Sequence, residues 1–137
     1  MFLEVSTELL GQGYGVRFRA GGHSMHPTIR DGEALTVMPV AAHAVRRGDI
    51  ILYKAVRGVT AHRVVRIEGE RGAARRFHLR GDAALSADAP VSAAQILGRV
   101  VAVERAGRQI ALSGHRAKLR AALRLCAVRL KARVRAF

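Results

Sequence analysis

Several residue types are scarce in this 137-residue sequence, which has no tryptophan, four phenylalanines, two tyrosines and one cysteine. The single cysteine, Cys126, excludes an internal disulfide framework and fits a reducing compartment. So few aromatic side chains, with no nucleic-acid-binding motif beside them, disfavour nucleic acid as a partner. The six histidines form no His-x-x-x-His pair and the chain has no Cys-rich spacing, so we expect neither a metal site nor a cofactor.

Long apolar runs are also missing from the sequence. A membrane-spanning helix needs about 20 consecutive apolar residues, and residues 1–23 are interrupted by Glu4, Glu8, Arg17 and Arg19. A secretory signal would begin with a basic stretch ahead of an apolar core, whereas acidic residues stand near the start of this chain. We therefore expect a cytoplasmic protein, peripheral at a membrane at most, without a signal peptide or transmembrane segment.

Acidic residues are few, 10 against 24 Lys and Arg, and the formal net charge is +14. Residues 113–137 hold eight of the basic residues and no acid, and Gly114 marks a break at their start. This pattern predicts an amphipathic C-terminal helix with a cationic face, separate from a domain over residues 1–112. Such a helix suits an anionic membrane surface, contacted through residues 115–137, or an acidic partner, or packing on its own domain. Its apolar residues recur at spacings of three and four: Leu119, Leu123, Cys126, Leu130, Val134 and Phe137.

The pattern over residues 1–112 predicts the fold class. A short helix is expected over residues 3–10, and Val16 to Ala20 alternate apolar and basic residues, which is typical of a half-buried strand. The chain is long enough for one domain with its own core. Gly, Pro and Asp turn signals separate the strands, and residues 105–108 read as a hairpin turn. We therefore predict a compact, mainly β domain, with further strands near 34–38, 49–54, 61–67, 76–80, 95–104 and 108–112.

The most informative stretch runs from Gly22 to Gly32 and contains Ser24-Met25-His26-Pro27-Thr28. A serine hydroxyl is a weak nucleophile at neutral pH and becomes a strong one only beside a positioned base. Pro27 restricts the backbone just after Ser24. Taken alone, the stretch also suits an ordinary connection between two strands.

Three later segments add to this serine segment. Gly48-Asp49-Ile50-Ile51 leads into an apolar strand, and His62-Arg63-Val64-Val65 opens the next one. Gly81-Asp82 then follows, with Asp88 six residues further on. Four short motifs in this order resemble the type I signal peptidases, over roughly residues 16–103. The match is closer to the archaeal and endoplasmic-reticulum branch, where histidine replaces the lysine of most bacterial enzymes.

The resemblance implies a role for each matching residue. Ser24 matches the nucleophile and His62 the general base, while Asp88 matches the acid that orients the histidine and Asp82 a second acid nearby. These are the roles of a Ser-His-Asp triad, and a neutral imidazole suits the base at cellular pH. Lys54, Lys118 and Lys131 are the only lysines, and none stands at the position of the bacterial lysine.

The sequence departs from the family beside the serine. Family members usually have Ser-Gly-Ser-Met there, whereas Gly22 and His23 precede Ser24 in this chain. Without that first hydroxyl, the oxyanion would rest mainly on backbone N–H groups, that of Ser24 among them, and losing one donor costs about 10²–10³ in rate. Gly22, Met25 and Pro27 are the residues that we expect to form the oxyanion and substrate-binding surroundings.

Two functions remain open on these grounds. The first is a serine endopeptidase that cuts a peptide or precursor protein through an acyl-enzyme. The second is a non-enzymatic basic module that binds a membrane surface or nucleic acid. Each residue also has an ordinary role open to it, since Ser24 and Asp82 suit turns and His62 suits a half-buried strand position. The complete set of four residues favours the peptidase, because a binding module does not need it.

Overall fold

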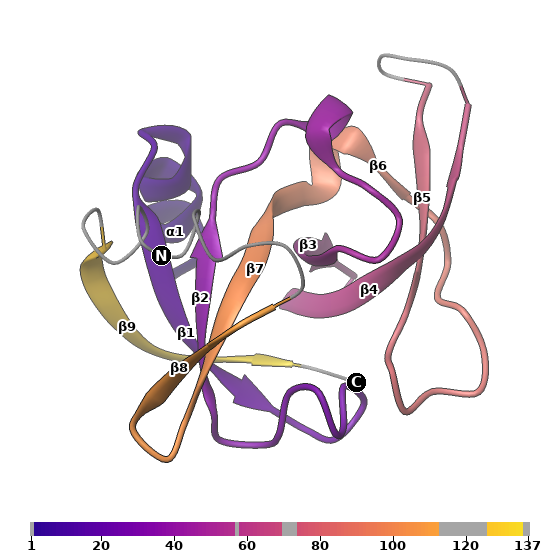
Figure 1. Cartoon of the computed structure of the whole chain (residues 1–137). Helices are drawn as coiled ribbons and strands as arrows, with labels where there is room; N and C mark the ends of the chain where they lie inside the picture. The colour runs from indigo at the N-terminus through magenta and orange to yellow at the C-terminus, as the bar shows by residue number, and fades with distance from the viewer. Residues whose placement is uncertain (1, 57, 70–73, 113–125, 136–137) are drawn as a thin grey trace.

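Strands are the main secondary structure in the computed structural model, which describes residues 2–56, 58–69, 74–112 and 126–135. One α-helix precedes the strands, and two short 3₁₀ helices lie in the connections (Figure 1). The mainly β fold with a short N-terminal helix is therefore confirmed. In chain order the elements are α1 (Phe2–Gly11), β1 (Gly15–Gly21), β2 (Ala34–Met38), η1 (Ala42–Ala44), β3 (Ile50–Ala55), β4 (Gly58–Glu68), β5 (Arg76–Arg80), β6 (Val91–Ser92), η2 (Ala93–Gln95), β7 (Ile96–Arg105), β8 (Arg108–Ala111) and β9 (Cys126–Arg135).

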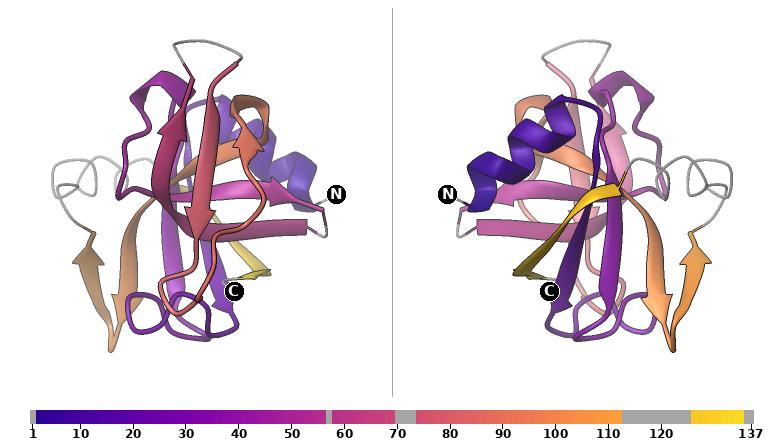
Figure 2. Two further views of the ribbon diagram at one scale, coloured as in Figure 1. Left: turned by 90° about the vertical axis from the view of Figure 1, so that its right-hand side faces the viewer. Right: turned by 90° about the vertical axis from the view of Figure 1, so that its left-hand side faces the viewer.

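The strands form one sheet in the order β3-β7-β2-β1-β9-β4-β5-β6, with β8 paired to β7. An additional pairing of β3 with β4 joins two distant positions of this order, so the sheet curls into a closed ring of strands. The pairings are antiparallel except those of β9, which runs parallel to β1 and to β4. Figure 2 shows α1 lying against the outside of this ring, while the β4–β5 hairpin extends beyond it.

Most predicted elements lie where the sequence pattern places them. The structure confirms a helix over the predicted residues 3–10 and strands near each of the seven predicted ranges. In β1, Val16, Phe18 and Ala20 are buried and Arg19 is exposed, as the alternation predicts. The short strand β6 is an element that the pattern does not reveal, because two residues are too few to establish a period.

The predicted hairpin turn joins β7 to β8. Arg105 pairs with Arg108, which leaves Ala106 and Gly107 as a two-residue loop. Both loop residues have positive φ, 50° and 75°. Two-residue loops of this kind match the right-handed twist of the flanking strands and therefore connect hairpins well.

The predicted C-terminal helix is wrong over Cys126–Arg135, where the structure has strand β9 instead. Residues 113–125 and 136–137, the rest of the predicted helix, lie outside the described residues. From Val128 to Arg135 apolar and basic residues alternate strictly, so the same stretch also satisfies the two-residue period of a strand. Pairing with β1, from Gly15 to Gly21, decides between the two periods and makes β9 part of the sheet of residues 1–112.

Two hydrophobic clusters hold the sheet together. The larger one fills the closed ring and includes Phe18, Met25 and Ile29, all at most 1 % exposed. The smaller one lies between β3, β4 and β5 and includes Tyr53 and Phe77. Burial of such side chains is the main favourable contribution to folding. Within the described parts of the chain, no helix is both long and apolar enough to cross a membrane.

Candidate active site

Ser24 lies in the connection between β1 and β2, which folds into a series of turns. Met25 and Ile29 of this connection are fully buried, and the Ile29 N–H donates to the Met25 carbonyl at 2.9 Å. Gly22 has φ of +96°, a conformation that a side chain would strain. The N–H of Gly22 donates to Asp31 Oδ1 at 3.0 Å, which closes the loop at its far end. Ser24 is therefore held half-buried on a well-anchored turn.

The Ser24 hydroxyl meets the imidazole of His62. Ser24 Oγ lies 3.0 Å from Nε2 of His62, a normal hydrogen-bond distance. His62 comes from the middle of β4 and is fully buried. Because His62 pairs with Ile51 of β3 in the sheet, its backbone position is fixed by the neighbouring strand.

Asp88 lies on the other ring nitrogen of His62. Its Oδ2 is in direct contact with Nδ1 of His62. The N–H of Asp88 donates to the Leu79 carbonyl at 2.7 Å, which ties the connection after β5 back to the end of that strand. The structure therefore brings Ser24, His62 and Asp88 together in one continuous chain of hydrogen bonds.

The chemistry of these groups defines the proton positions. An ionised carboxylate can only accept hydrogen bonds, so Nδ1 of His62 carries a proton towards Asp88. In the neutral ring Nε2 is then an acceptor, and the Ser24 hydroxyl donates to it. This is the tautomer that a histidine needs in order to take a proton from a serine.

Asp82, the second predicted acid, contacts Arg63 and Thr28 instead of His62. It accepts from Arg63 at both oxygens, 2.7 Å from Nε and 2.8 Å from Nη2, and from the Thr28 hydroxyl at 2.6 Å. Burial alone would raise the pKa of Asp82, but the hydrogen bonds from Arg63 and Thr28 outweigh it and hold this pKa below its usual range. Asp82 therefore joins the connection between β1 and β2, residues 22–33, which we call the serine loop, to β4 as an ionised clamp. Among the described residues it makes no hydrogen bond to His62.

Gly81 is placed where a side chain does not fit. A Cβ added to Gly81 would lie 2.6 Å from the Ser24 carbonyl oxygen and 3.2 Å from Nε2 of His62. Two residues on, the Ala83 N–H donates to the Ser24 carbonyl at 2.8 Å. The connection after β5 thus packs directly on the serine and the histidine, which explains the glycine in Gly81-Asp82.

The three residues predicted to surround the serine have different positions. Met25 is fully buried, and its sulfur accepts from the Asp82 N–H at 3.3 Å, so it supports Ser24 from the core side. Pro27 is exposed. The N–H of Gly22 is engaged by Asp31, so the backbone N–H of Ser24 is the remaining predicted oxyanion donor of this loop.

Tyr53 is absent from the predicted set. Its hydroxyl lies 3.1 Å from Oδ2 of Asp88, and its ring lies 6.2 Å from the His62 ring between centroids. A tyrosine within the apolar run Ile50-Ile51-Leu52 is a usable signal, because a buried tyrosine hydroxyl usually finds a polar partner. The sequence does not indicate which partner that is.

The other residues of the serine loop do not supply the base. His23 and His26 lie with their ring centroids 5.5 Å apart. His62 is the histidine on the Ser24 hydroxyl. Among the described residues, no group of three or more His, Cys, Asp and Glu side chains is arranged to hold a metal ion.

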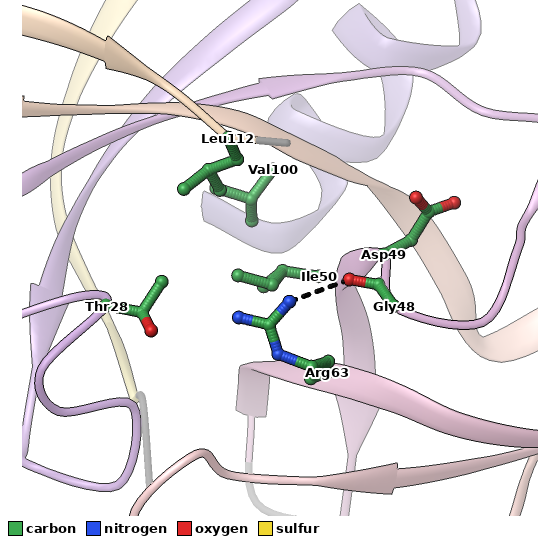
Figure 3. A pocket seen from close by; sticks show the side chains of 7 residues that line it. All are labelled: Thr28, Gly48, Asp49, Ile50, Arg63, Val100 and Leu112. Atoms are coloured by element: carbon green, nitrogen blue, oxygen red, sulfur yellow. Dashed lines mark hydrogen bonds between the residues drawn. The ribbon is translucent and has the colours of Figure 1, made fainter. Parts of the chain in front are cut away.

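A small pocket of about 70 Å³ lies on the Arg63 side of the serine loop (Figure 3). In Figure 3 the Arg63 guanidinium points into it and donates to the Gly48 carbonyl, 2.8 Å from Nη1. Ser24, His62 and Asp88 are not among its lining residues, so this pocket is separate from the hydrogen-bonded set. It is lined by Thr28, Gly48, Asp49, Ile50, Arg63, Val100 and Leu112.

No protein-family model, no curated protein and no solved structure matches this chain. A function for this chain is therefore inferred from the residues and geometry of the site.

Proposed function

We propose that the protein is a serine endopeptidase of the signal-peptidase-like type, which cuts a peptide or a precursor protein through an acyl-enzyme. The observation that carries this proposal is the 3.0 Å contact of Ser24 Oγ with Nε2 of His62, continued from Nδ1 to Asp88. Nucleophile, base and orienting acid within hydrogen-bond reach are the geometry that serine acyl transfer requires. The single cysteine further supports a reducing compartment such as the cytoplasm.

The proposed reaction follows from the roles of these groups. Ser24 Oγ attacks the scissile carbonyl carbon as its proton passes to Nε2 of His62, and the carbonyl oxygen becomes an oxyanion. The backbone N–H of Ser24 is a donor for that oxyanion. The imidazolium then gives its proton to the leaving amine, which departs and leaves the acyl group on Ser24. A water molecule, deprotonated by His62, hydrolyses this ester and restores the hydroxyl.

Asp88 and Gly81 support this reaction in different ways. The Asp88 carboxylate keeps the proton of the resting His62 on Nδ1 and stabilises the imidazolium that forms during attack. Gly81 lets the chain pass close to both reacting groups, since any side chain there would meet the Ser24 carbonyl. Because His62 is buried, water has little access to its ring and competes little for the hydrogen bonds that the ring makes.

The direct test replaces the nucleophile. Ser24→Ala removes one oxygen and little packing, so we expect an unchanged unfolding midpoint and a loss of peptide hydrolysis by a factor of about 10⁴ or more. A serine-reactive fluorophosphonate probe, followed by mass spectrometry of the labelled peptide, reports the same hydroxyl without knowledge of the substrate. We expect labelling at Ser24 in the wild-type protein.

Ser86→Ala is the matched control, because Ser86 is an exposed serine only two residues from Asp88. This variant should keep full labelling. If Ser24→Ala is labelled as strongly as the wild type, or if the folded wild-type protein is not labelled at all, the peptidase proposal is wrong and the basic binding module becomes the better interpretation.

A further inference from the structure

The Tyr53 side chain reaches Asp88 from the core. Tyr53 is the fourth residue of β3, it is 5 % exposed, and it packs in the smaller hydrophobic cluster beside Val64 and Leu79. Its hydroxyl donates to Oδ2 of Asp88 at 3.1 Å. The same carboxylate oxygen contacts Nδ1 of His62, so one acceptor atom serves both donors.

Of the two contacts that the structure gives the Tyr53 hydroxyl, the one to Asp88 is the shorter. The hydroxyl oxygen is 3.5 Å from Nδ1 of His62, which is too long for a strong hydrogen bond, and the proton on Nδ1 points to Asp88. A phenylalanine would fill the same space in the cluster without a polar group to satisfy. What the tyrosine adds over a phenylalanine is therefore the hydrogen bond from its hydroxyl to the Asp88 carboxylate.

Asp88 needs such support because its surroundings are open. Its side chain is 33 % exposed, and the connection that carries it, residues 81–90, has no regular secondary structure. In the same connection Leu85 is fully exposed. The bond from the Asp88 N–H to Leu79 fixes the backbone but leaves the side-chain torsions free. Water therefore competes with His62 for the carboxylate.

We propose that Tyr53 is a positioning residue of this site, whose hydroxyl keeps the Asp88 carboxylate turned towards Nδ1 of His62. The effect on rate rests on the proposed peptidase function, whereas the effect on His62 does not. Burial, and then the charge of Asp88 and the hydrogen bond to it, raise the pKa of Tyr53 well above its ordinary value. Because the hydroxyl therefore stays protonated, it remains a donor throughout the neutral and mildly alkaline range.

The first test is Tyr53→Phe, with Tyr14→Phe as the matched control. Tyr14 is the other tyrosine, and it is 38 % exposed. We expect Tyr53→Phe to lower kcat about tenfold with little change in KM, because one hydrogen bond to a charged group is lost and no substrate contact changes. Tyr14→Phe should change neither constant.

A double-variant cycle separates positioning from a general structural effect. In an Asp88→Ala background the hydroxyl has no carboxylate to hold, so Tyr53→Phe should cost no further loss of rate. If Tyr53→Phe lowers kcat by the same factor with and without Asp88, the proposal is overturned.

The second test needs no activity and therefore separates failure of this proposal from failure of the peptidase assignment. Proton NMR should show a downfield Nδ1–H resonance of His62 in the wild-type protein and in Tyr14→Phe. In Tyr53→Phe this resonance should move upfield or exchange rapidly with water. An unchanged resonance would overturn the proposal, even in a protein that the serine probe does not label.

A milder perturbation covers the case in which Tyr53→Phe does not fold. In Tyr14→Phe protein grown with 3-fluorotyrosine, the only fluorinated ring is that of Tyr53. Fluorine makes the hydroxyl a stronger donor without removing it, so the Nδ1–H resonance of His62 should shift while the fold is kept. No shift in the folded, fluorinated protein would contradict the proposal.

Discussion

His62 and Arg63 are neighbours on β4, yet their side chains reach different carboxylates. His62 is fully buried and joins Ser24 to Asp88. Arg63 is about one third exposed and holds Asp82 through two parallel hydrogen bonds. Successive residues of a strand point to opposite sides, so a single dipeptide serves a candidate catalytic set on one side and a structural clamp on the other.

The two carboxylates show what this difference means. Asp82 and Asp88 belong to the same connection after β5, but Asp82 is satisfied by a cation and a hydroxyl, and Asp88 by an imidazole and a phenol. A carboxylate paired with a permanent cation is fixed in its ionised state and contributes to stability. A carboxylate on an imidazole can influence where that ring holds its proton. Similar residues close in sequence thus have different tasks because their partners differ.

The largest contrast is expected between His62→Ala and Arg63→Ala. His62→Ala should reduce hydrolysis about as much as Ser24→Ala, since the members of one catalytic unit are not additive. Arg63→Ala should keep probe labelling of Ser24 in the folded protein but lose about 1–3 kcal/mol of unfolding free energy, because Asp82 is left without its cation. Labelling and urea unfolding of both variants measure this. If Arg63→Ala abolishes labelling without loss of stability, the two sides of β4 are not separate.

The two carboxylates should give a smaller contrast of the same kind. Asp88→Asn should lower kcat by about 10²–10⁴, because an amide can donate to Nδ1 of His62 and so favour the tautomer that cannot accept from Ser24. Asp82→Asn should have the weaker effect on kcat and should cost about 1–3 kcal/mol of unfolding free energy, as the Arg63 ion pair is lost. Steady-state kinetics and urea unfolding compare them. The reverse order of kcat effects would reassign the orienting acid to Asp82.

The smallest effect is expected in the acid dependence of stability. The pKa of Asp82 is lowered in the folded protein, so its contribution is present above the pKa of an unfolded aspartate and is lost as the pH falls through the lower, folded value. Unfolding free energy should therefore decline below about pH 5, and it should decline less steeply in Asp82→Asn. Urea unfolding from pH 3 to pH 7 measures this. Identical slopes in the two proteins would contradict the clamp.

Much of the fold follows from local patterns. The helix after the N-terminus, the strands from β1 to β8 except β6, and the β7–β8 hairpin lie where periodicity and turn residues predict them. β1 and β5 alternate between buried and less buried residues, whereas β3 and β7 are recognised as short apolar runs whose consecutive residues are buried. Local patterns do not predict the order of strands in the sheet, since the pairings of β3 with β7 and of β1 with β9 join segments far apart in the chain.

The candidate site was predictable in part. The resemblance names Ser24, His62 and Asp88, which the structure brings into contact, and also Asp82, which the structure places on Arg63. No local rule separates the two acids, because both lie in the same irregular connection after β5. Tyr53 belongs to none of the four motifs. Its position near His62 depends on the pairing of β3 with β4.

The sequence by itself determines the strand periods, the turns, the charge and the presence of a serine, a histidine and an acid in a suggestive order. Only the tertiary structure decides which acid reaches the histidine, because the Asp88 backbone is tied to Leu79 and its side chain is within reach of Tyr53. The tertiary structure likewise decides the secondary structure of Cys126–Arg135. That stretch fits a helix and a strand equally well, and the open edge of β1 supplies backbone partners for the strand alone.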